Sequence, residues 1–154
     1  MAVSISEELK KILDHKNTLK LIASIDTNGV PHVTVKTSLN VTKNGGLYYL
    51  EFFENSKTNK NLIGSLWFNK VVAINIVSED RRSFLIKGRV KRTAIAGREF
   101  EKFYKDAQAQ DEKNDLSAIY YIEPEEIREE TFEVRREEEA KKNPLYIHLD
   151  RLVK

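Results

Sequence analysis

Three short turn sequences separate β-rich segments along the first part of the chain. They are Thr27-Asn28-Gly29, Lys43-Asn44-Gly45-Gly46 and Glu79-Asp80-Arg81-Arg82. Turns this short connect antiparallel neighbours, because a parallel pair needs a crossover of a dozen or more residues. The chain is therefore expected to form an antiparallel sheet.

The pattern of apolar residues and turn residues predicts the order of the elements. Strands are expected at 19–26, 30–42, 47–53, 70–78, 83–95 and 116–124, the last ended by Pro124. Helices are expected at 4–16, 56–67 and 97–110, a solvated helical turn or linker at 136–142, and a terminal segment with alternating apolar residues at 144–152. Six strands in about a hundred residues predict a mainly β fold, a small closed or split barrel. A Rossmann fold is disfavoured, since the chain has no GxGxxG motif.

Length and composition narrow the class of protein. The 154 residues are expected to form a single domain, 1–154, with an N-terminal helix within 1–17 and a C-terminal extension at 120–154. The formal charge of +2 arises from 26 basic and 24 acidic residues, so nucleic-acid binding is not expected. No apolar run approaches the roughly 20 residues of a membrane helix. The N-terminus does not resemble a signal peptide, and a cytoplasmic location is expected.

Protein-based catalysis has little support in the sequence. Cysteine is absent, which excludes thiolate catalysis and cysteine-ligated metal. His15, His32 and His148 lie far apart and have no metal-ligand spacing. We therefore expect no catalytic side chain and no metal site.

The stretch 54–69, ENSKTNKNLIGSLWFN, predicts a helix with Ser56 as N-cap. Its first turn holds Lys57 and Lys60, although the positive end of a helix usually collects acidic residues. Free backbone N–H groups, two hydroxyls and a lysine at such an end can bind phosphate. A solvent-exposed basic helix start explains the same residues, and the stretch alone does not separate the two.

A second stretch carries polar residues in alternation. In the strand 30–42, one face holds His32, Thr34, Lys36 and Ser38, and the other Val33, Val35, Thr37 and Leu39. The polar row suits either water or a phosphorylated ligand on the outer wall of a barrel. Gly88 lies within another predicted strand, where it indicates a bulge or a close approach by backbone or ligand.

The ordered set GVPHVTVKTSLN, LYYLEFFENSKTNKNLIGS, KVVAINIV and SFLIKGRVKRT resembles the pyridoxamine 5′-phosphate oxidase-like family of FMN-binding split barrels, over about residues 15–110. The resemblance implies a six-stranded antiparallel split barrel that forms a homodimer with FMN at the subunit interface. The cofactor-binding positions that it implies are Thr34, Val35, Lys36, Thr37, Ser38, Glu51, Phe52, Phe53, Ser56, Lys57 and Thr58. Ser56, Lys57 and Thr58 are the implied phosphate contacts, which Asn61 would support from the next turn.

The chain departs from the pyridoxamine phosphate oxidases proper in two places. Thr34 stands where they carry arginine, and Arg135, Arg136, His148 and Arg151 make an unfamiliar C-terminal pattern. These departures weaken the case for vitamin B6 activity and leave the flavin positions intact. Other split barrels bind deazaflavin or haem. The Ser56-Lys57-Thr58 turn favours FMN over haem, whereas deazaflavin also bears phosphate.

Three hypotheses for function follow. The first is an FMN-dependent oxidoreductase acting on a small molecule, in which Lys36 stabilises negative charge on the flavin and Thr37 or Ser38 donates to the ring. The second is a non-enzymatic FMN protein for electron transfer or flavin storage, and the third is a barrel without a cofactor. Phe52 and Phe53 are candidates to pack near the ring, and Trp67 is expected in the core.

Overall fold

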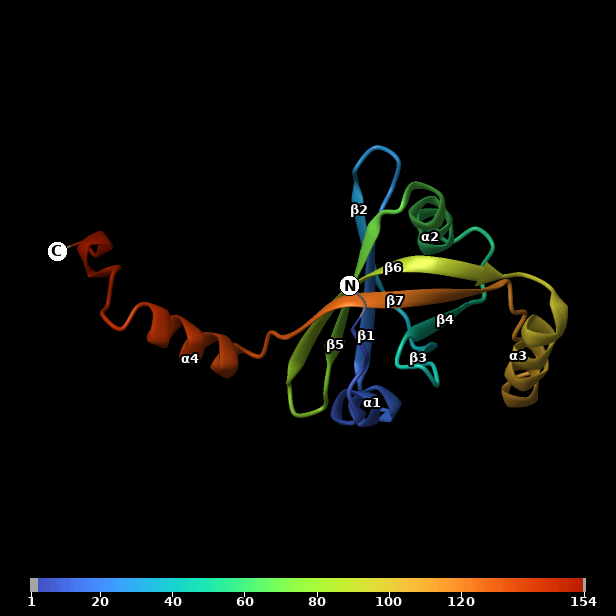
Figure 1. The fold of residues 1–154 in the computed structure, drawn as a ribbon, viewed down its shortest axis with the longest axis horizontal. Helices are drawn as coiled ribbons and strands as arrows, with labels where there is room; N and C mark the ends of the chain where they lie inside the picture. Colours follow the sequence, from blue (N-terminus) through green and yellow to red (C-terminus); the bar gives the residue numbers. More distant parts are fainter. Residues whose placement is uncertain (1–2, 154) are drawn as a thin grey trace.

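The computed structural model describes residues 3–153, so the ends of the predicted 1–154 domain, and the start of its 1–17 helix, lie outside the described residues. A single antiparallel sheet of seven strands forms its body (Figure 1). The strands are β1 (Leu19–Ile25), β2 (Pro31–Val35), β3 (Leu39–Val41), β4 (Leu47–Glu51), β5 (Val71–Val77), β6 (Ser83–Ala94) and β7 (Ala118–Glu129). Their order across the sheet is β2-β1-β5-β6-β7-β4-β3. The prediction of a mainly β, antiparallel fold is confirmed.

The seventh strand arises because the predicted strand 30–42 is divided. β2 and β3 form opposite edges of the sheet, yet only Lys36, Thr37 and Ser38 separate them in the chain. Four Cα-to-Cα steps span at most about 14 Å, so the sheet must curl until its two edges are close. This curling produces the split barrel. We refer to Lys36–Ser38 as the crossing segment.

Gly88 of β6 and Pro124 of β7 face each other beside an irregularity in the pairing of these strands. Pro124 does not end its strand as predicted, because β7 continues to Glu129. The register shifts between Lys87 and Gly88, so that Gly88 pairs with Pro124 and Glu125 forms a bulge. A Cβ on Gly88 would lie 2.5 Å from the Glu123 carbonyl oxygen. Of the alternatives predicted at Gly88, the bulge and the close backbone approach are both present.

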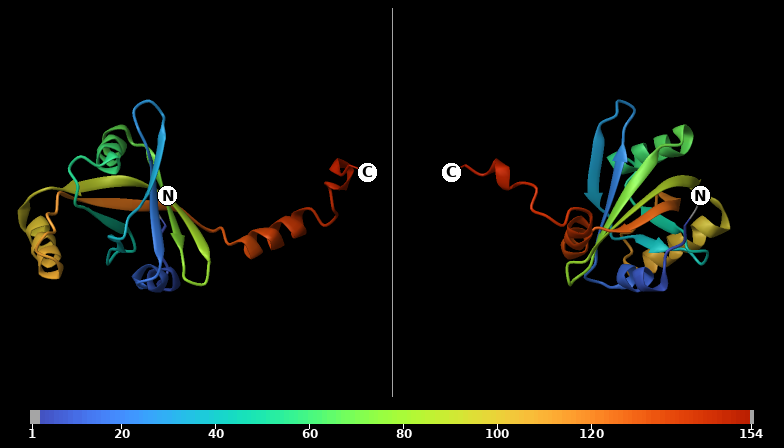
Figure 2. Two further views of the ribbon diagram at one scale, coloured as in Figure 1. Left: turned by 180° about the vertical axis from the view of Figure 1, so that it is seen from behind. Right: turned by 60° about the vertical axis from the view of Figure 1, so that its left-hand side comes forward.

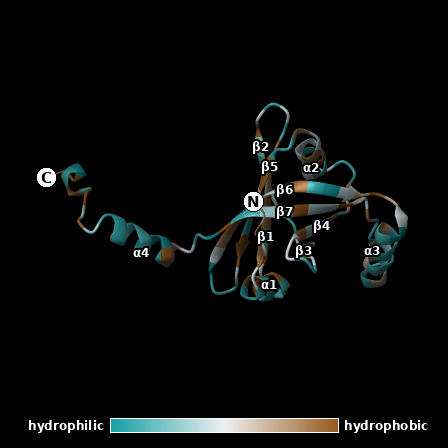
Figure 3. Ribbon diagram, in the orientation of Figure 1, coloured by the Kyte–Doolittle hydropathy of each residue, from teal (hydrophilic) through white to brown (hydrophobic). Residues whose placement is uncertain are grey.

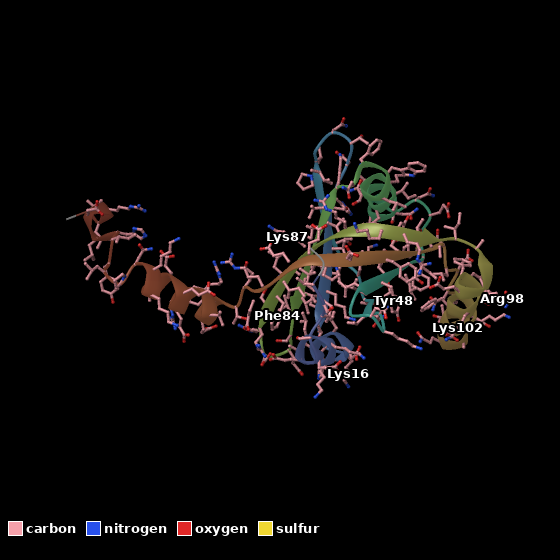
Figure 4. The ribbon with its side chains drawn as sticks, viewed as in Figure 1. Lys16, Tyr48, Phe84, Lys87, Arg98 and Lys102 are labelled. Atoms are coloured by element: carbon pink, nitrogen blue, oxygen red, sulfur yellow. The ribbon has the colours of Figure 1, made fainter. Side chains whose placement is uncertain are left out.

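Three helices surround the curled sheet (Figure 2). They are α1 (Glu7–Asp14), α2 (Lys57–Phe68) and α3 (Gly97–Gln110), which match the predicted helices. α2 contacts β1, β2, β5 and β6, which fixes it against one end of the barrel. Tyr48 of β4 reaches toward α3, where its ring centroid lies 5.2 Å from that of Phe103 (Figure 4).

The core lies inside the curl, where the strands carry their apolar residues (Figure 3). Alternate residues of β1, β5 and β6 are buried, as the period of two in a strand requires. Leu9 and Leu13 of α1 close one end of this core. The inner residues with no exposed surface include Ile22, Leu39, Leu47, Leu62, Ile74, Ile76 and Ile86.

The C-terminal residues leave the body as an arm (Figures 1 and 2). α4 spans Phe132–Lys142 and is therefore longer than the predicted 136–142. None of its residues is buried. The segment 144–152 does not form a strand and contains only the 3-10 turn η1 (Leu149–Arg151). Its alternating apolar residues lie away from the edges of the sheet, so no neighbouring strand pairs with them.

Candidate functional site

The crossing segment is held in place by hydrogen bonds from neighbouring elements. Lys20 of β1 is buried, and its Nζ donates to the carbonyl oxygens of Leu39 at 2.8 Å and Thr37 at 3.4 Å. The Ser38 hydroxyl donates to the Leu50 carbonyl at 2.6 Å. Because burial disfavours the charged form, the pKa of Lys20 lies below its ordinary value. The Ser38 proton is already engaged, which leaves Thr37 as the better of the two predicted hydroxyl donors.

Lys36 and Glu51 form an ion pair beside the crossing segment. The Lys36 Nζ lies 3.6 Å from Glu51 Oε2, and Glu51 has no exposed surface. Glu51 Oε1 accepts a hydrogen bond from the backbone N–H of Phe53 at 3.2 Å. The Lys36 ammonium also lies 5.6 Å from the centre of the Tyr49 ring. Tertiary folding thus brings together two predicted site residues that are 15 positions apart in the sequence.

The start of α2 has the predicted cap. Ser56 Oγ accepts from the backbone N–H of Asn59 at 2.9 Å. The backbone N–H groups of Lys57 and Thr58 donate none of the hydrogen bonds found within residues 3–153. The first turn contains no acidic residue. Two donors therefore point out of the positive end of a helix of 12 residues.

Buried polar side chains anchor this helix start. Tyr120 of β7 donates its hydroxyl proton to Asn59 Oδ1, and Asn59 Nδ2 donates to the Glu54 carbonyl at 3.0 Å. Asn61 Nδ2 donates to Ser24 Oγ on β1 at 3.0 Å. Burial raises the pKa of Tyr120, so its hydroxyl keeps its proton at neutral pH. The support expected from Asn61 is present as a bond to the sheet.

A hollow of about 200 Å³ lies along α2, from Lys57 to Phe68, beside the loop that joins β1 to β2. Lys57, Lys60 and Lys70 line it, together with the carboxylate of Asp26. Lys57 Nζ lies 3.3 Å from Asp26 Oδ2. Hydrogen bonds, the strongest from the Val30 N–H, lower the pKa of Asp26 and keep it ionised. Three lysines and one aspartate leave a formal charge of +2 in the hollow.

The polar row of the divided strand faces the opposite way from the prediction. Thr34 pairs with Ile22 and His32 with Ser24, so the polar residues share the inner face of β1 and are half-buried. The valines face outward instead: Val33 is 62% exposed and Val35 is 48% exposed. The idea of a polar outer wall at this strand is therefore wrong. Alternation showed that the faces differ but not which one meets the core.

Aromatic residues near the site are also more exposed than expected. Trp67, predicted in the core, is 77% exposed because it lies on the outer side of α2. Phe53 is 70% exposed in the loop after β4, and Phe52 is half-buried there. Thr58 is buried, and its Oγ1 has no hydrogen-bond partner.

Several contributors to this site were not identified from the sequence. Lys20 lies on β1, Asp26 directly follows β1, and Tyr120 lies on β7. None of the three belongs to the stretches from which site residues were predicted. Asp26 could have been suspected, since its carboxylate accepts from the N–H groups of Asn28 and Val30 in an Asp-initiated turn. The roles of Tyr120 and Lys20 depend on strand pairing, for which the sequence held no signal.

Other kinds of site find no support in the described part of the chain. Within residues 3–153, no group of three or more metal-ligating side chains could hold a metal ion. In the same range, no helix is both long enough and apolar enough to cross a membrane. His15 ends α1 and its ring nitrogen accepts from the Asn17 N–H at 3.2 Å, a structural role.

Comparison with solved structures identifies the class of fold. HupZ of Group A Streptococcus matches with a TM-score of 0.67 and 22% identity, over 83% of this chain and 95% of its own. An FMN-binding protein from Syntrophomonas wolfei matches with a TM-score of 0.63 and 8% identity, over 80% and 84%. A proposed pyridoxamine 5′-phosphate oxidase from Lactobacillus delbrueckii matches with a TM-score of 0.58 and 20% identity, over 81% and 93%.

HutZ from Vibrio cholerae, described as a heme storage protein, has the same fold with a TM-score of 0.53 and 14% identity, over 82% of this chain and 95% of its own. No protein-family model matches this sequence, and no curated protein is significantly similar to it. The chain therefore has the split-barrel fold of the pyridoxamine 5′-phosphate oxidase-like proteins. That fold is shared by proteins described as binding different cofactors.

The residues at the start of α2 fit the phosphate end of FMN. The hollow carries net positive charge, and within the described residues the backbone N–H groups of Lys57 and Thr58 donate no hydrogen bond. A volume of about 200 Å³ holds a phosphate group but not a flavin ring. The ring would have to lie outside this hollow.

Proposed function

We propose that this protein binds FMN and is an FMN-dependent oxidoreductase acting on a small molecule. The observation that carries the proposal is the start of α2. Within residues 3–153 the N–H groups of Lys57 and Thr58 donate no hydrogen bond, and Lys57 lines a hollow with a formal charge of +2. Helix N-termini of this kind bind phosphate because their donors and their dipole both favour an anion. The split-barrel fold, which this chain shares with an FMN-binding protein, supports the same assignment.

Each basic residue of the hollow has a distinct role in this proposal. The Lys57 ammonium leaves Asp26 to bind the phosphate, or binds both groups at once. Its side chain is about half-exposed and can change its rotamer. Lys60 adds charge from the same turn. Lys70 donates to the Asp26 carbonyl at 3.3 Å and steadies the loop behind the phosphate. Ser56 remains the helix cap.

The proposal includes a homodimer, for which the outer face of the sheet supplies the argument. The pairings of β1 with β2 and β5 bring Leu21 beside Val35, and Ala23 beside both Val33 and Ala73. Val33, Ala23 and Ala73 form an apolar row across three strands, and Leu21 and Val35 extend it on two of them. Two copies would bury it between them, as soluble proteins rarely leave such a patch exposed.

A bound FMN would supply the electron-transfer chemistry, and the protein would supply position and charge. Lys36 is the candidate cation for the ring, with Thr37 as a neighbouring donor. The exposed Phe53 is the candidate aromatic contact, since it follows Glu51 by two positions and lies at the surface. No side chain is proposed as a nucleophile. A cytoplasmic location remains part of the proposal.

A paired titration tests the cofactor assignment. The purified protein is titrated with FMN and with riboflavin, which lacks the phosphate, and flavin fluorescence and absorbance are followed. We expect FMN to bind at least tenfold more tightly than riboflavin, because charge-assisted hydrogen bonds to phosphate contribute about 1.5–3 kcal/mol each. Equal binding of the two flavins contradicts the phosphate assignment, and binding of neither contradicts the flavoprotein assignment.

A second assay separates an enzyme from an FMN carrier. The FMN-loaded protein is mixed with NADH or NADPH under anaerobic conditions, and acceptors are then added. Turnover with a donor and an acceptor supports the oxidoreductase. Failure of every donor would leave the non-enzymatic alternative of electron transfer or flavin storage.

Haem binding is a second candidate, favoured by the arm. A hollow of about 740 Å³ there is lined by His148, Arg135 and Arg136 among apolar residues that include Leu145 and Leu149. Histidine is a common haem ligand, and arginine can pair with carboxylates. Haemin added to wild type and to His148→Ala distinguishes this candidate. A Soret shift that requires His148 would support haem as a ligand of the arm, and no shift would contradict it.

A further inference from the structure

Glu51 is an unusual residue for its position. The alternation of β4 directs Leu47, Tyr49 and Glu51 into the barrel, and Glu51 has no exposed surface. Burying a carboxylate among apolar side chains costs several kcal/mol unless charge and hydrogen bonds compensate. Packing alone would favour an apolar residue here. The carboxylate therefore calls for a role that uses its charge.

The compensation for Glu51 is incomplete. Oε1 accepts from the Phe53 N–H, while Oε2 has no hydrogen-bond partner among residues 3–153. Lys36 Nζ lies 3.6 Å from Oε2, too far for a good hydrogen bond but close enough for strong Coulombic attraction in a buried site. The carboxylate thus acts on Lys36 mainly through its charge.

Lys36 in turn has unused donors. Within residues 3–153, its Nζ donates none of the hydrogen bonds that the structure contains, although an ammonium carries three protons. The contrast with Lys20 is direct, because the Lys20 ammonium donates to the backbone carbonyls of Thr37 in the crossing segment and Leu39 at the start of β3. Lys20 is a structural lysine. Lys36, with a side chain 14% exposed, is largely buried and donates no hydrogen bond within the described residues.

We propose that Glu51 is a positioning residue that holds the Lys36 ammonium at the crossing segment. Its carboxylate also partly neutralises the positive charge that Lys36 presents to a bound flavin. This inference rests on the proposed FMN function and assigns Glu51 a role different from the direct contact that the family resemblance implies. A carboxylate without exposed surface does not touch the ligand. It acts through Lys36, whose spare protons are directed to the flavin.

The charge balance predicts opposite effects for the two partners. Glu51→Gln keeps the size of the side chain and removes its negative charge, so the uncompensated ammonium favours the more negative, reduced form of FMN. We expect the affinity ratio of reduced to oxidised FMN to rise about tenfold, which is about 30 mV for a two-electron couple. Lys36→Met removes the ammonium and should lower the same ratio.

The experiment measures the midpoint potential of bound FMN in wild type, Glu51→Gln, Lys36→Met and Lys36→Arg. Glu125→Gln is the matched control, since Glu125 pairs with Arg89 at 2.8 Å on the outer part of β7. The control should leave the potential unchanged, and Lys36→Arg should retain most of the wild-type value. The Lys36 variants keep the test valid even if Glu51→Gln fails to fold.

Two results would overturn the inference, and they are distinguishable. FMN-loaded variants whose potentials all equal that of wild type would remove the role of the pair and leave the FMN function standing. A wild-type protein that binds no FMN would overturn the proposed function and this inference with it.

Discussion

The two helices α1 and α2 begin in the same way and are completed differently. Each has a serine N-cap that accepts from the N–H three residues later, Ser6 from Leu9 and Ser56 from Asn59. The first turn of α1 then carries Glu7 and Glu8, which suit the helix dipole. The first turn of α2 carries lysines instead, and Lys57 forms an ion pair with Asp26, which follows β1.

The difference separates a helix made by local rules from one set into a site. α1 is stabilised by its own sequence and by Leu9 and Leu13 in the core. α2 buries the polar residues Thr58, Asn59, Asn61 and Ser65, of which Asn59 and Asn61 bond to Tyr120 and Ser24 on the sheet. A helix that only covered the core would bury apolar residues at these positions. The comparison predicts that equivalent changes in the two helices have unequal consequences.

The largest expected effect is on ligand affinity. Lys57→Ala should weaken FMN binding by about 10- to 150-fold, the loss of a charge-assisted hydrogen bond worth about 1.5–3 kcal/mol. Lys10→Ala on α1 is the control and should leave the affinity unchanged. Isothermal titration with FMN measures both. Equal affinity in Lys57→Ala and wild type would end the distinction between the two helix starts as far as phosphate is concerned.

A similar effect on stability is expected at the anchor of α2. Tyr120→Phe leaves Asn59 Oδ1 buried without its donor, and this should cost about 1–3 kcal/mol of the free energy of unfolding. Urea denaturation measures the loss. Tyr104→Phe on α3 removes an exposed hydroxyl that donates to Asp115, and this variant should change stability by much less. If the two variants were equally stable, the Asn59 anchor would have no special weight.

A smaller, matched effect is expected at the caps. Ser6→Ala and Ser56→Ala should each destabilise the protein by about 1 kcal/mol, because each removes an acceptor for one N–H group. Thermal melts compare them without ligand. Excess FMN should then raise the melting temperature of wild type more than that of Ser56→Ala, while Ser6→Ala responds like wild type. An identical ligand response in all three proteins would contradict the assignment of the α2 start.

The smallest effect concerns acid stability at Asp26. Hydrogen bonds from Val30 and Asn28, together with Lys57, lower its pKa in the folded state. A lowered folded pKa contributes stability above the unfolded pKa, near 3.8, that is lost as pH falls below that value. Asp26→Asn should therefore flatten this part of the stability curve. Denaturation at pH 3 and pH 6 measures the difference, and an unchanged pH dependence would exclude the interaction.

Most of the elements could be predicted from the sequence. Caps, tight turns and alternation act within a few residues, so the strands at 19–26, 47–53, 70–78 and 83–95 and the helix at 97–110 agree with the structure within one or two residues. The exceptions have long-range causes. β7 continues past Pro124 because the pairing is irregular at the bulge opposite Gly88, where no N–H is needed from the proline. The predicted strand 30–42 divides because the chain passes there from one edge of the sheet to the other.

The site could be predicted only in part. Ser56, Lys57 and Thr58 remain predicted phosphate contacts. The unusual charge at this helix start is visible in a single stretch, whereas Asp26 and Tyr120 come near it only through the pairing of strands. The same limit applies to Trp67 and to the valines of β2, whose exposure depends on which face the sheet turns to the core.

By itself, the sequence determined the antiparallel elements, the Ser56 cap and the basic first turn of α2, because these depend on neighbours within a few positions. The tertiary structure alone decided that β2 turns its valines outward, that Asp26 meets Lys57, and that Glu51 is buried against Lys36. Each of these depends on how the curled sheet brings distant strands together, and pairing register is a property of the whole fold.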